Sequence, residues 1–167
     1  TIVNVSSTNA FVATPFMGAY SAAKAALESF SDALRLELRP FGVDVVLVQP
    51  GAMRTGFADR AKELLDAEAA RTGEPWAGYL RRLKESDLWG EGRAADPAQV
   101  ARVVARVALA RRPPARVAGT REVPLLRAFA ALPDALKDAV FVRPLGLRRP
   151  RPRGGRRAAG ATAAAAW

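Results

Sequence analysis

The chain has 167 residues, half of them apolar, and a formal net charge of +10. This length is sufficient for one domain with a hydrophobic core. Cysteine and histidine are both absent, which excludes disulfides, thiol nucleophiles, Cys/His zinc sites and Ser-His-Asp hydrolysis. Any acid or base that acts near neutral pH must therefore be Tyr, Lys, Asp or Glu.

The charge is unevenly distributed along the chain. No acidic residue follows Asp138, whereas seven arginines do, and from residue 148 the chain is mostly Arg, Pro, Gly and Ala. Such a composition cannot build a core, so residues 148–167 are predicted to be a disordered tail and 1–147 the folded domain. No apolar run approaches the roughly 20 residues that span a bilayer, and no signal peptide is visible. We therefore expect a cytoplasmic protein without a membrane span.

Two strands flanking one long helix are predicted at the start of the chain. Residues 1–5 have the β-branched content of a strand. Residues 43–49 contain four consecutive apolar residues, as expected for a strand covered on both faces of a parallel sheet. Between them, 19–38 is a predicted helix. Its apolar side chains recur at helical spacing and share one face of the helix, made of Leu27, Phe30, Leu34 and Leu38.

The order strand, helix, buried strand is that of a βαβ unit with two parallel strands. In sheets of this kind, ligands bind beyond the carboxyl ends of the strands. Here the strands end at Ser6 and Ser7 and at Pro50 and Gly51. We therefore expect these two turns to line one crevice.

The later elements are less regular. In chain order, the sequence predicts a helix at 54–71, a short helix within 72–95, a helix at 97–110, a short strand at 115–118 and one or two helical pieces at 123–141. Asp96 is the expected N-cap of the third of these, with Pro97 in the first helical position. Pro133 is expected to divide the last one.

Three side chains carry the candidate chemistry. Tyr20 and Lys24 are four residues apart near a helix N-terminus, so they lie on one face, one turn apart. A nearby ammonium favours the phenolate form of a tyrosine, which makes such a pair an acid/base usable near neutral pH. Ser7 follows the adjacent strand, where its hydroxyl can bond a substrate oxygen as charge develops on it.

The chain resembles the short-chain dehydrogenase/reductase family. Ser7 lies thirteen residues before Tyr20 of a Tyr-x-x-x-Lys motif. Three further motifs agree in order and spacing: Asn4-Val5-Ser6-Ser7, Glu37-Leu38-x-Pro40-x-Gly42-Val43 and Pro50-Gly51-x-x-x-Thr55. Each motif is weak alone, and together they are specific. The resemblance covers residues 1–119 clearly and 121–147 loosely.

The resemblance implies a Rossmann-type α/β fold, a doubly wound parallel sheet, and hydride transfer between NAD or NADP and a carbonyl or alcohol carbon. Within it, Tyr20 is the acid/base and also a cofactor-binding residue, Lys24 bonds the nicotinamide ribose, and Ser7 orients the substrate oxygen. The family places the 50–51 turn beside the nicotinamide, with Met53 near its carboxamide and Thr55 near the diphosphate. Thr55 is equally well explained as the cap of the next helix.

Several family features are missing from the chain. The Gly-x-x-x-Gly-x-Gly phosphate turn, the Asn-Ala-Gly motif and the helix asparagine of the proton relay all precede, in the family, the strand that residues 1–5 resemble. On the order of 100 residues, four βα units, would hold them. We therefore expect the C-terminal catalytic half of the domain, with exposed strand edges, poor solubility and little activity alone. Ala10 is a smaller departure, since the family commonly has glycine there.

The substrate is expected to be a small-molecule alcohol or ketone. Residues 123–141 loosely resemble retinoid- or steroid-type members, which would suit a lipophilic compound. Trp76, Tyr79 and Trp89 are interpreted either as a substrate lid or as ordinary packing, with packing favoured for each one. No metal is expected, because the Cys and His ligands are absent.

Two other functions stay open. The basic tail could neutralise nucleic-acid phosphates, but it lacks interleaved aromatic residues and has only Trp167 at its end. We therefore expect no nucleic-acid binding. Alternatively, the chain is a non-catalytic remnant that acts by association through 19–38, a helix that in the family often packs against a partner subunit. A homo-oligomer is thus possible for an intact parent.

Overall fold

The computed structural model describes residues 1–148 of the chain, so the predicted disordered tail lies outside the described residues except for Arg148. Within this part, three parallel strands form one sheet in the order β1 (Ile2–Val5), β2 (Val45–Gln49) and β3 (Arg116–Ala118). Ile2 pairs with Val45, and Leu47 pairs with Arg116. The predicted parallel α/β architecture is confirmed, including the short third strand.

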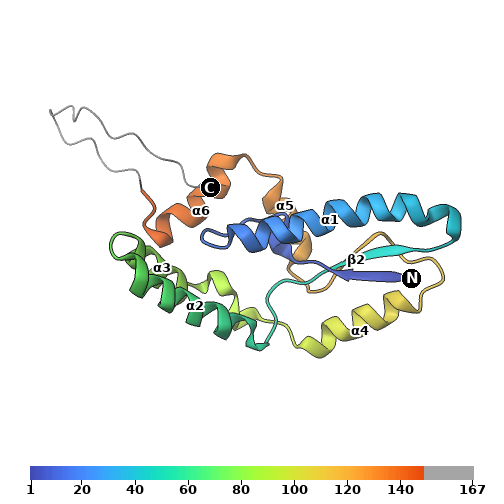
Figure 1. Ribbon diagram of the computed structural model, residues 1–167, viewed down its shortest axis with the longest axis horizontal. Coiled ribbons are helices and arrows are strands. Elements are labelled where there is room, and N and C mark those ends of the chain that lie inside the picture. The colour runs from blue at the N-terminus through green and yellow to red at the C-terminus, as the bar shows by residue number, and fades with distance from the viewer. Residues whose placement is uncertain (149–167) are drawn as a thin grey trace.

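Helices cover both faces of this sheet. In Figure 1, α1 (Gly18–Leu38) lies along one side of the strands and α4 (Pro97–Ala108) along the other. The central strand β2 is consequently buried along its whole length, as its unbroken apolar run predicted. As predicted, Asp96 caps α4, since its side chain accepts a hydrogen bond from the amide of Ala98.

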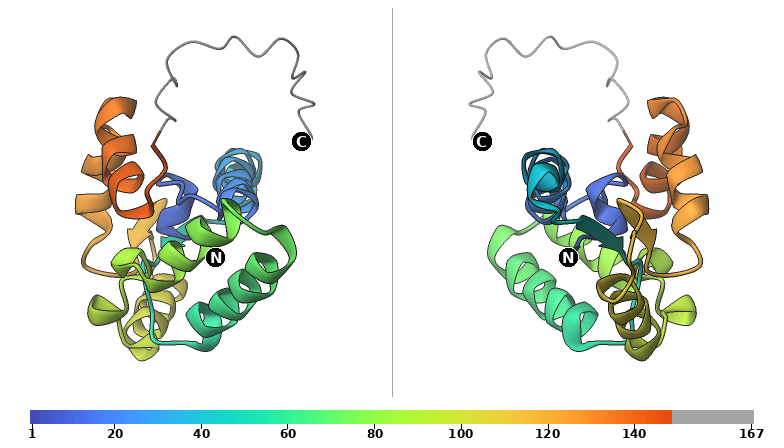
Figure 2. Two further views of the ribbon diagram at one scale, coloured as in Figure 1. Left: turned by 90° about the vertical axis from the view of Figure 1, so that its left-hand side faces the viewer. Right: turned by 90° about the vertical axis from the view of Figure 1, so that its right-hand side faces the viewer.

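The remaining helices form two pairs near the carboxyl ends of the strands. They are α2 (Gly56–Thr72) with α3 (Trp76–Glu85), and α5 (Val123–Ala130) with α6 (Asp134–Leu145). Figure 2 shows α2 and α5 on opposite sides of the molecule, and α3 contacts α6 between them. Pro133 separates α5 from α6, as predicted, although α6 extends four residues beyond the expected end. Short 3-10 turns cover Thr8–Ala10, Arg39–Phe41, Asp87–Trp89 and Glu91–Arg93.

Strand β1 lies at an edge of the sheet, and no other strand in residues 1–148 pairs with its outer side. Two of its apolar side chains, Ile2 and Val5, are exposed. An unpaired apolar edge is a template for association with other chains. The expected exposure of a strand edge is therefore found, and the poor solubility inferred from it stays a prediction.

The apolar face of α1 is only partly buried. Phe30 is 61% exposed, and the three leucines of that face are only half-buried. The side of α1 that packs on the sheet is polar instead and includes the buried Ser21 and Ser31. Ser31 accepts a hydrogen bond from Asn4 of β1 at 2.8 Å and donates one to the carbonyl of Leu27. Ser31 can be buried here because Asn4 of the sheet supplies a partner for its hydroxyl.

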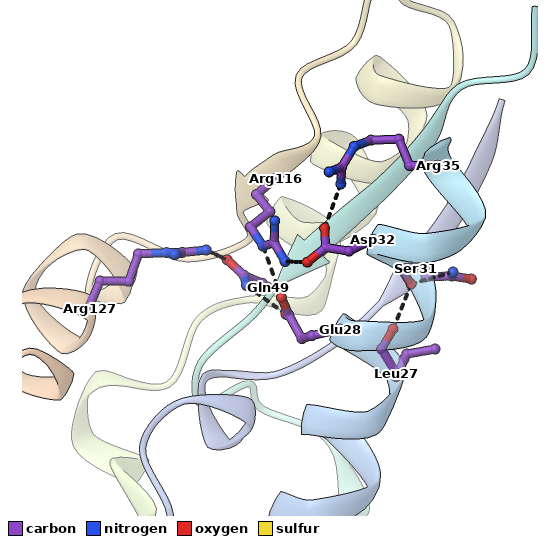
Figure 3. Close-up of polar contacts among 9 residues, drawn as sticks. Leu27, Glu28, Ser31, Asp32, Arg35, Gln49, Arg116 and Arg127 are labelled. Atoms are coloured by element: carbon purple, nitrogen blue, oxygen red, sulfur yellow. Dashed lines mark hydrogen bonds and ion pairs between the residues drawn. The ribbon is translucent and has the colours of Figure 1, made fainter. Parts of the chain in front are cut away.

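A chain of polar contacts joins α1 to β2, β3 and α5 (Figure 3). The buried Gln49 donates to Glu28 at 2.6 Å and accepts from Arg127 of α5. Arg116 of β3 bonds Glu28 at 3.0 Å and Asp32 at 2.6 Å. These contacts fix α5 and α1 against the same strand, which sets the relative placement of the side chains at its carboxyl end.

This network should make stability depend on pH in the acid range. Hydrogen bonds from Arg116 and Arg35 hold the pKa of the Asp32 carboxyl below its usual value of 3.8. The folded protein therefore gains stability from the carboxylate above that pH and loses it as the pH falls through the lowered pKa. Because the Asp32 side chain is 40% exposed, we expect a contribution of about 0.5–1 kcal/mol.

Urea unfolding at pH 3 and pH 7 measures this contribution. Asp32→Asn should reduce the difference in unfolding free energy between the two pH values. The control is Asp138→Asn, which removes an exposed carboxyl of α6 for which the structure describes no ion pair. An Asp32→Asn protein with the wild-type pH dependence would contradict the role assigned to this carboxylate.

Candidate active site

A cavity of about 540 Å³ lies beyond the carboxyl ends of β1 and β2. Its walls come from the turns after both strands, the start of α1 and the two helix pairs. All seven predicted site residues line it, namely Ser7, Tyr20, Lys24, Pro50, Gly51, Met53 and Thr55. The two strand-end turns therefore do share one crevice, as the carboxyl-end rule for parallel sheets predicted.

Ser7 is buried directly after β1 and begins the 3-10 turn Thr8–Ala10. Its Oγ accepts a hydrogen bond from the amide of Asn9 at 3.2 Å. An accepted bond leaves the hydroxyl hydrogen available for donation to a ligand oxygen. Ala10, where the family commonly has glycine, lies at the end of the turn and does not line the cavity.

Tyr20 and Lys24 lie one turn apart in the first two turns of α1, and both are half-buried. The Nζ atom of Lys24 lies 5.9 Å from the centre of the Tyr20 ring. It donates a hydrogen bond of 3.0 Å to the carbonyl of Val5, the last residue of β1. On its other side, the Tyr20 ring packs against Phe57 of α2, with 5.3 Å between ring centres. Helix α1 thus brings a phenol and an ammonium into the cavity beside the end of β1.

Hydrogen bonds from three other parts of the chain hold the segment 50–55 in place. The amide of Gly51 donates to Thr120 Oγ1 at 2.8 Å, and the carbonyl of Pro50 accepts from Thr8 at 2.9 Å. Further along, Ala52 and Arg54 form backbone hydrogen bonds with Ala95, both of 2.9 Å. These bonds hold the segment at the rim of the cavity in a defined conformation.

Thr55 has the capping role that was one of its two interpretations. It is the N-cap of α2, since its hydroxyl accepts from the amide of Phe57 at 3.4 Å, and it also lines the cavity. The helix start behind it presents backbone amides toward solvent, which is the usual setting for an anionic group.

Comparisons with known proteins agree with this geometry. A family model described as short chain dehydrogenase matches residues 1–65, which include every predicted site residue. A 3-ketodihydrosphingosine reductase of Bacteroides thetaiotaomicron is 34% identical over 139 residues, covering 80% of this chain and 49% of that protein. An NADPH-dependent 3-dehydrocapnine reductase of Ornithobacterium rhinotracheale is 31% identical over 146 residues, covering 86% of this chain and 50% of that protein. The chain belongs to the short-chain dehydrogenase/reductase family.

The solved structures give the same result for the fold. The crystal structure of a short-chain dehydrogenase from Streptomyces avermitilis superposes with a TM-score of 0.56 and 26% identity. The match covers 83% of this chain and 48% of that one. The chain therefore spans about half the length of the family members that it matches, and the described part has their Rossmann-like parallel α/β fold.

The far wall of the cavity in this short-chain dehydrogenase/reductase is apolar. It is formed by the C-terminal helix pair, with Leu125, Leu126, Phe129, Val140 and Phe141. Two of these, Leu125 and Val140, are exposed, so part of the wall faces solvent. The sequence indicated an apolar region here but could not assign individual residues to the cavity.

The three aromatic residues of the predicted lid region have different surroundings. Trp89 lines the cavity, and its indole donates to the carbonyl of Leu83 at 2.9 Å. Trp76 is 54% exposed and packs between Phe16 and Tyr79, with ring centres 6.2 and 5.8 Å away. Neither Trp76 nor Tyr79 lines the cavity. The packing interpretation therefore fits these two residues, whereas Trp89 contributes to the cavity wall.

Sequence reasoning missed Glu122, which also lines the cavity. It follows the third strand by four residues, so the carboxyl-end rule, applied to β3 as well, would have found it. No group of three or more His, Cys, Asp or Glu side chains in the described part of the chain could hold a metal ion. The helices described here also include none with the length and hydrophobicity to cross a membrane.

Proposed function

We propose that this chain carries the catalytic half of an oxidoreductase that interconverts carbonyl and alcohol groups with NAD or NADP. One observation carries the proposal: Ser7, Tyr20 and Lys24 line the same cavity as the 50–55 segment. The name of the capnine-type relative makes NADPH the first cofactor to test. The apolar wall, together with relatives named for dihydrosphingosine and steroid substrates, supports a lipophilic alcohol or ketone.

The residues of the cavity fit the nicotinamide end of such a cofactor. A Cβ atom on Gly51 would overlap a neighbouring side chain, so the turn presents bare backbone at the rim. Lys24 and Thr55 offer polar donors on either side of that turn. Bound there, the nicotinamide would supply or accept the hydride. Residues 1–148 offer no glycine-rich phosphate turn for the adenosine end.

Side chains of this chain would transfer the proton to the substrate's carbonyl oxygen and orient that oxygen. In the reductive direction, the Tyr20 hydroxyl donates its proton to the carbonyl oxygen as that oxygen gains charge. The Ser7 hydroxyl donates a hydrogen bond to the same oxygen and orients it. The ammonium of Lys24 stabilises the phenolate that remains on Tyr20. In the oxidative direction the same groups act in reverse.

NADPH consumption by the purified chain tests the proposal, with 2-decanone as a lipophilic test ketone. We expect a saturable change in NADPH fluorescence and turnover measured by the loss of NADPH absorbance, from this chain or, because little activity is predicted for it alone, from a longer protein that contains it. No turnover by this chain, or by a longer protein that contains it, would contradict the proposal. That result would favour the second candidate, a non-catalytic role in association with another chain. The exposed apolar side chains of Phe30 and Leu36 in α1 support this candidate.

A further inference from the structure

One carboxylate in the cavity has no part in the reaction proposed above. Glu122 lies between β3 and α5 and lines the cavity. It is only partly exposed. Within residues 1–148, no hydrogen bond or ion pair to its carboxylate is found. A carboxylate at a cavity wall that accepts no hydrogen bond from the protein is available to a ligand donor.

The carboxylate does not serve the helix that follows it. Glu122 is the N-cap residue of α5, yet its side chain makes no capping hydrogen bond. It lies instead against Gly51, so closely that a Cβ atom added to this glycine would overlap the Oε1 atom of Glu122. The carboxylate is therefore directed to the 50–51 turn, where the nicotinamide end of the cofactor is proposed to bind.

The surroundings make a bound ligand the natural partner of this carboxylate. Leu125, Leu126 and Phe129 follow on the same helix and form the apolar wall. Water can solvate Glu122 while the half-open cavity is free, but an apolar ligand that fills the cavity would displace that water. An unpaired carboxylate would then lose its hydration without compensation, which is strongly unfavourable.

The other charged groups of the cavity do not meet this need. The ammonium of Lys24 donates to the carbonyl of Val5 at 3.0 Å, and Arg93 has a partner of its own. A ligand that brings a positively charged hydrogen-bond donor beside its reacting carbon would satisfy the carboxylate. A long apolar chain on the same ligand would cover the exposed Leu125 and Val140.

We propose that Glu122 selects substrates that carry an ammonium group next to the carbonyl or alcohol carbon and a long apolar tail. The inference rests on the function proposed for the cavity and specifies its substrate class as lipophilic amino ketones or amino alcohols. Glu122 binds the ammonium, while α5 and α6 cover the tail. Tyr20 and Ser7 engage the oxygen between these two parts.

Kinetics with a matched pair of ketones tests the role of Glu122. The probes are 2-aminododecan-3-one, as its hydrochloride, and dodecan-3-one, which lacks only the amine. The wild-type chain should prefer the amino ketone by about 10- to 100-fold in kcat/KM, as expected for a hydrogen bond between charged groups. Glu122→Gln should reduce this preference to about threefold or less. Glu85→Gln removes an exposed charge of α3 outside the cavity and should leave the preference unchanged.

Two kinetic outcomes would overturn the inference. The first is a preference for the amino ketone that survives Glu122→Gln. The second is a loss of NADPH affinity in Glu122→Gln that is equal with both ketones, because the carboxylate would then serve the cofactor and not the substrate.

A binding measurement separates this inference from the proposed function. If neither ketone is turned over by this chain or by a longer protein that contains it, the proposed function fails, and tryptophan fluorescence still reports binding because Trp89 lines the cavity. Decylammonium should then change the fluorescence of the wild-type chain at a concentration at least about tenfold lower than decanol does, and Glu122→Gln should remove the difference. If decylammonium and decanol change the fluorescence of the wild-type chain at the same concentration, the assignment of Glu122 is overturned.

Discussion

Phenylalanine in place of Tyr20 should lower kcat by about 10²- to 10⁴-fold, the usual contribution of a positioned general acid or base. The substitution removes only the hydroxyl. The ring contact with Phe57, 5.3 Å between centres, is retained, so the fold and the cavity should persist. Cofactor affinity should change little, because the proton that Tyr20 transfers matters in the transition state and not in the bound ground state.

Tyr79→Phe is the matched control, because Tyr20 and Tyr79 are the two tyrosines of the chain. Tyr79 lies in α3 and packs against Trp76, outside the cavity. Its replacement should leave kcat within about twofold of the wild type, as for a surface change away from the site. Equal activity of wild type and Tyr20→Phe in stopped-flow assays would remove Tyr20 from the mechanism.

Alanine in place of Gly119 should destabilise the protein by about 1–3 kcal/mol, the usual cost of overpacking a tight site. Gly119 is buried just after β3, and its amide donates to the carbonyl of Gln49 at 2.7 Å. A Cβ atom added there would lie 2.9 Å from both the Cα and the N of Pro50. Backbone cannot move aside as a flexible side chain can, so the 50–51 turn must shift.

The same substitution should therefore affect binding as well as folding. We expect a lower midpoint in urea unfolding and weaker NADPH binding for Gly119→Ala. Gly56→Ala serves as the control, since a Cβ atom on Gly56, the first residue of α2, would meet no atom within 4 Å. Wild-type stability and wild-type cofactor affinity in Gly119→Ala would show that the turn tolerates the displacement.

Much of the catalytic geometry could be predicted from the sequence because it is local. Tyr20 and Lys24 share a helix face through their spacing alone. Ser7 and the 50–51 turn meet because parallel strands end on the same side of a sheet. The strand, helix and strand that carry them have clear start and stop signals, and the structure places these elements within two residues of the predicted bounds.

The features that could not be predicted from the sequence depend on contacts between residues far apart along the chain. The polar face of α1 is the one that packs on the sheet, because Asn4, Gln49 and Arg116, separated from their partners by 27, 21 and 88 residues, satisfy its polar groups. Hydrophobic periodicity carries no information about such compensation, so it identified an apolar face of α1 without showing which face is buried. The sequence alone determined the family's reacting groups and their spacing. Only the tertiary structure decided which face of α1 is buried and brought Glu122 against Gly51, since both follow from long-range hydrogen bonding and from the pairing of β3 with β2.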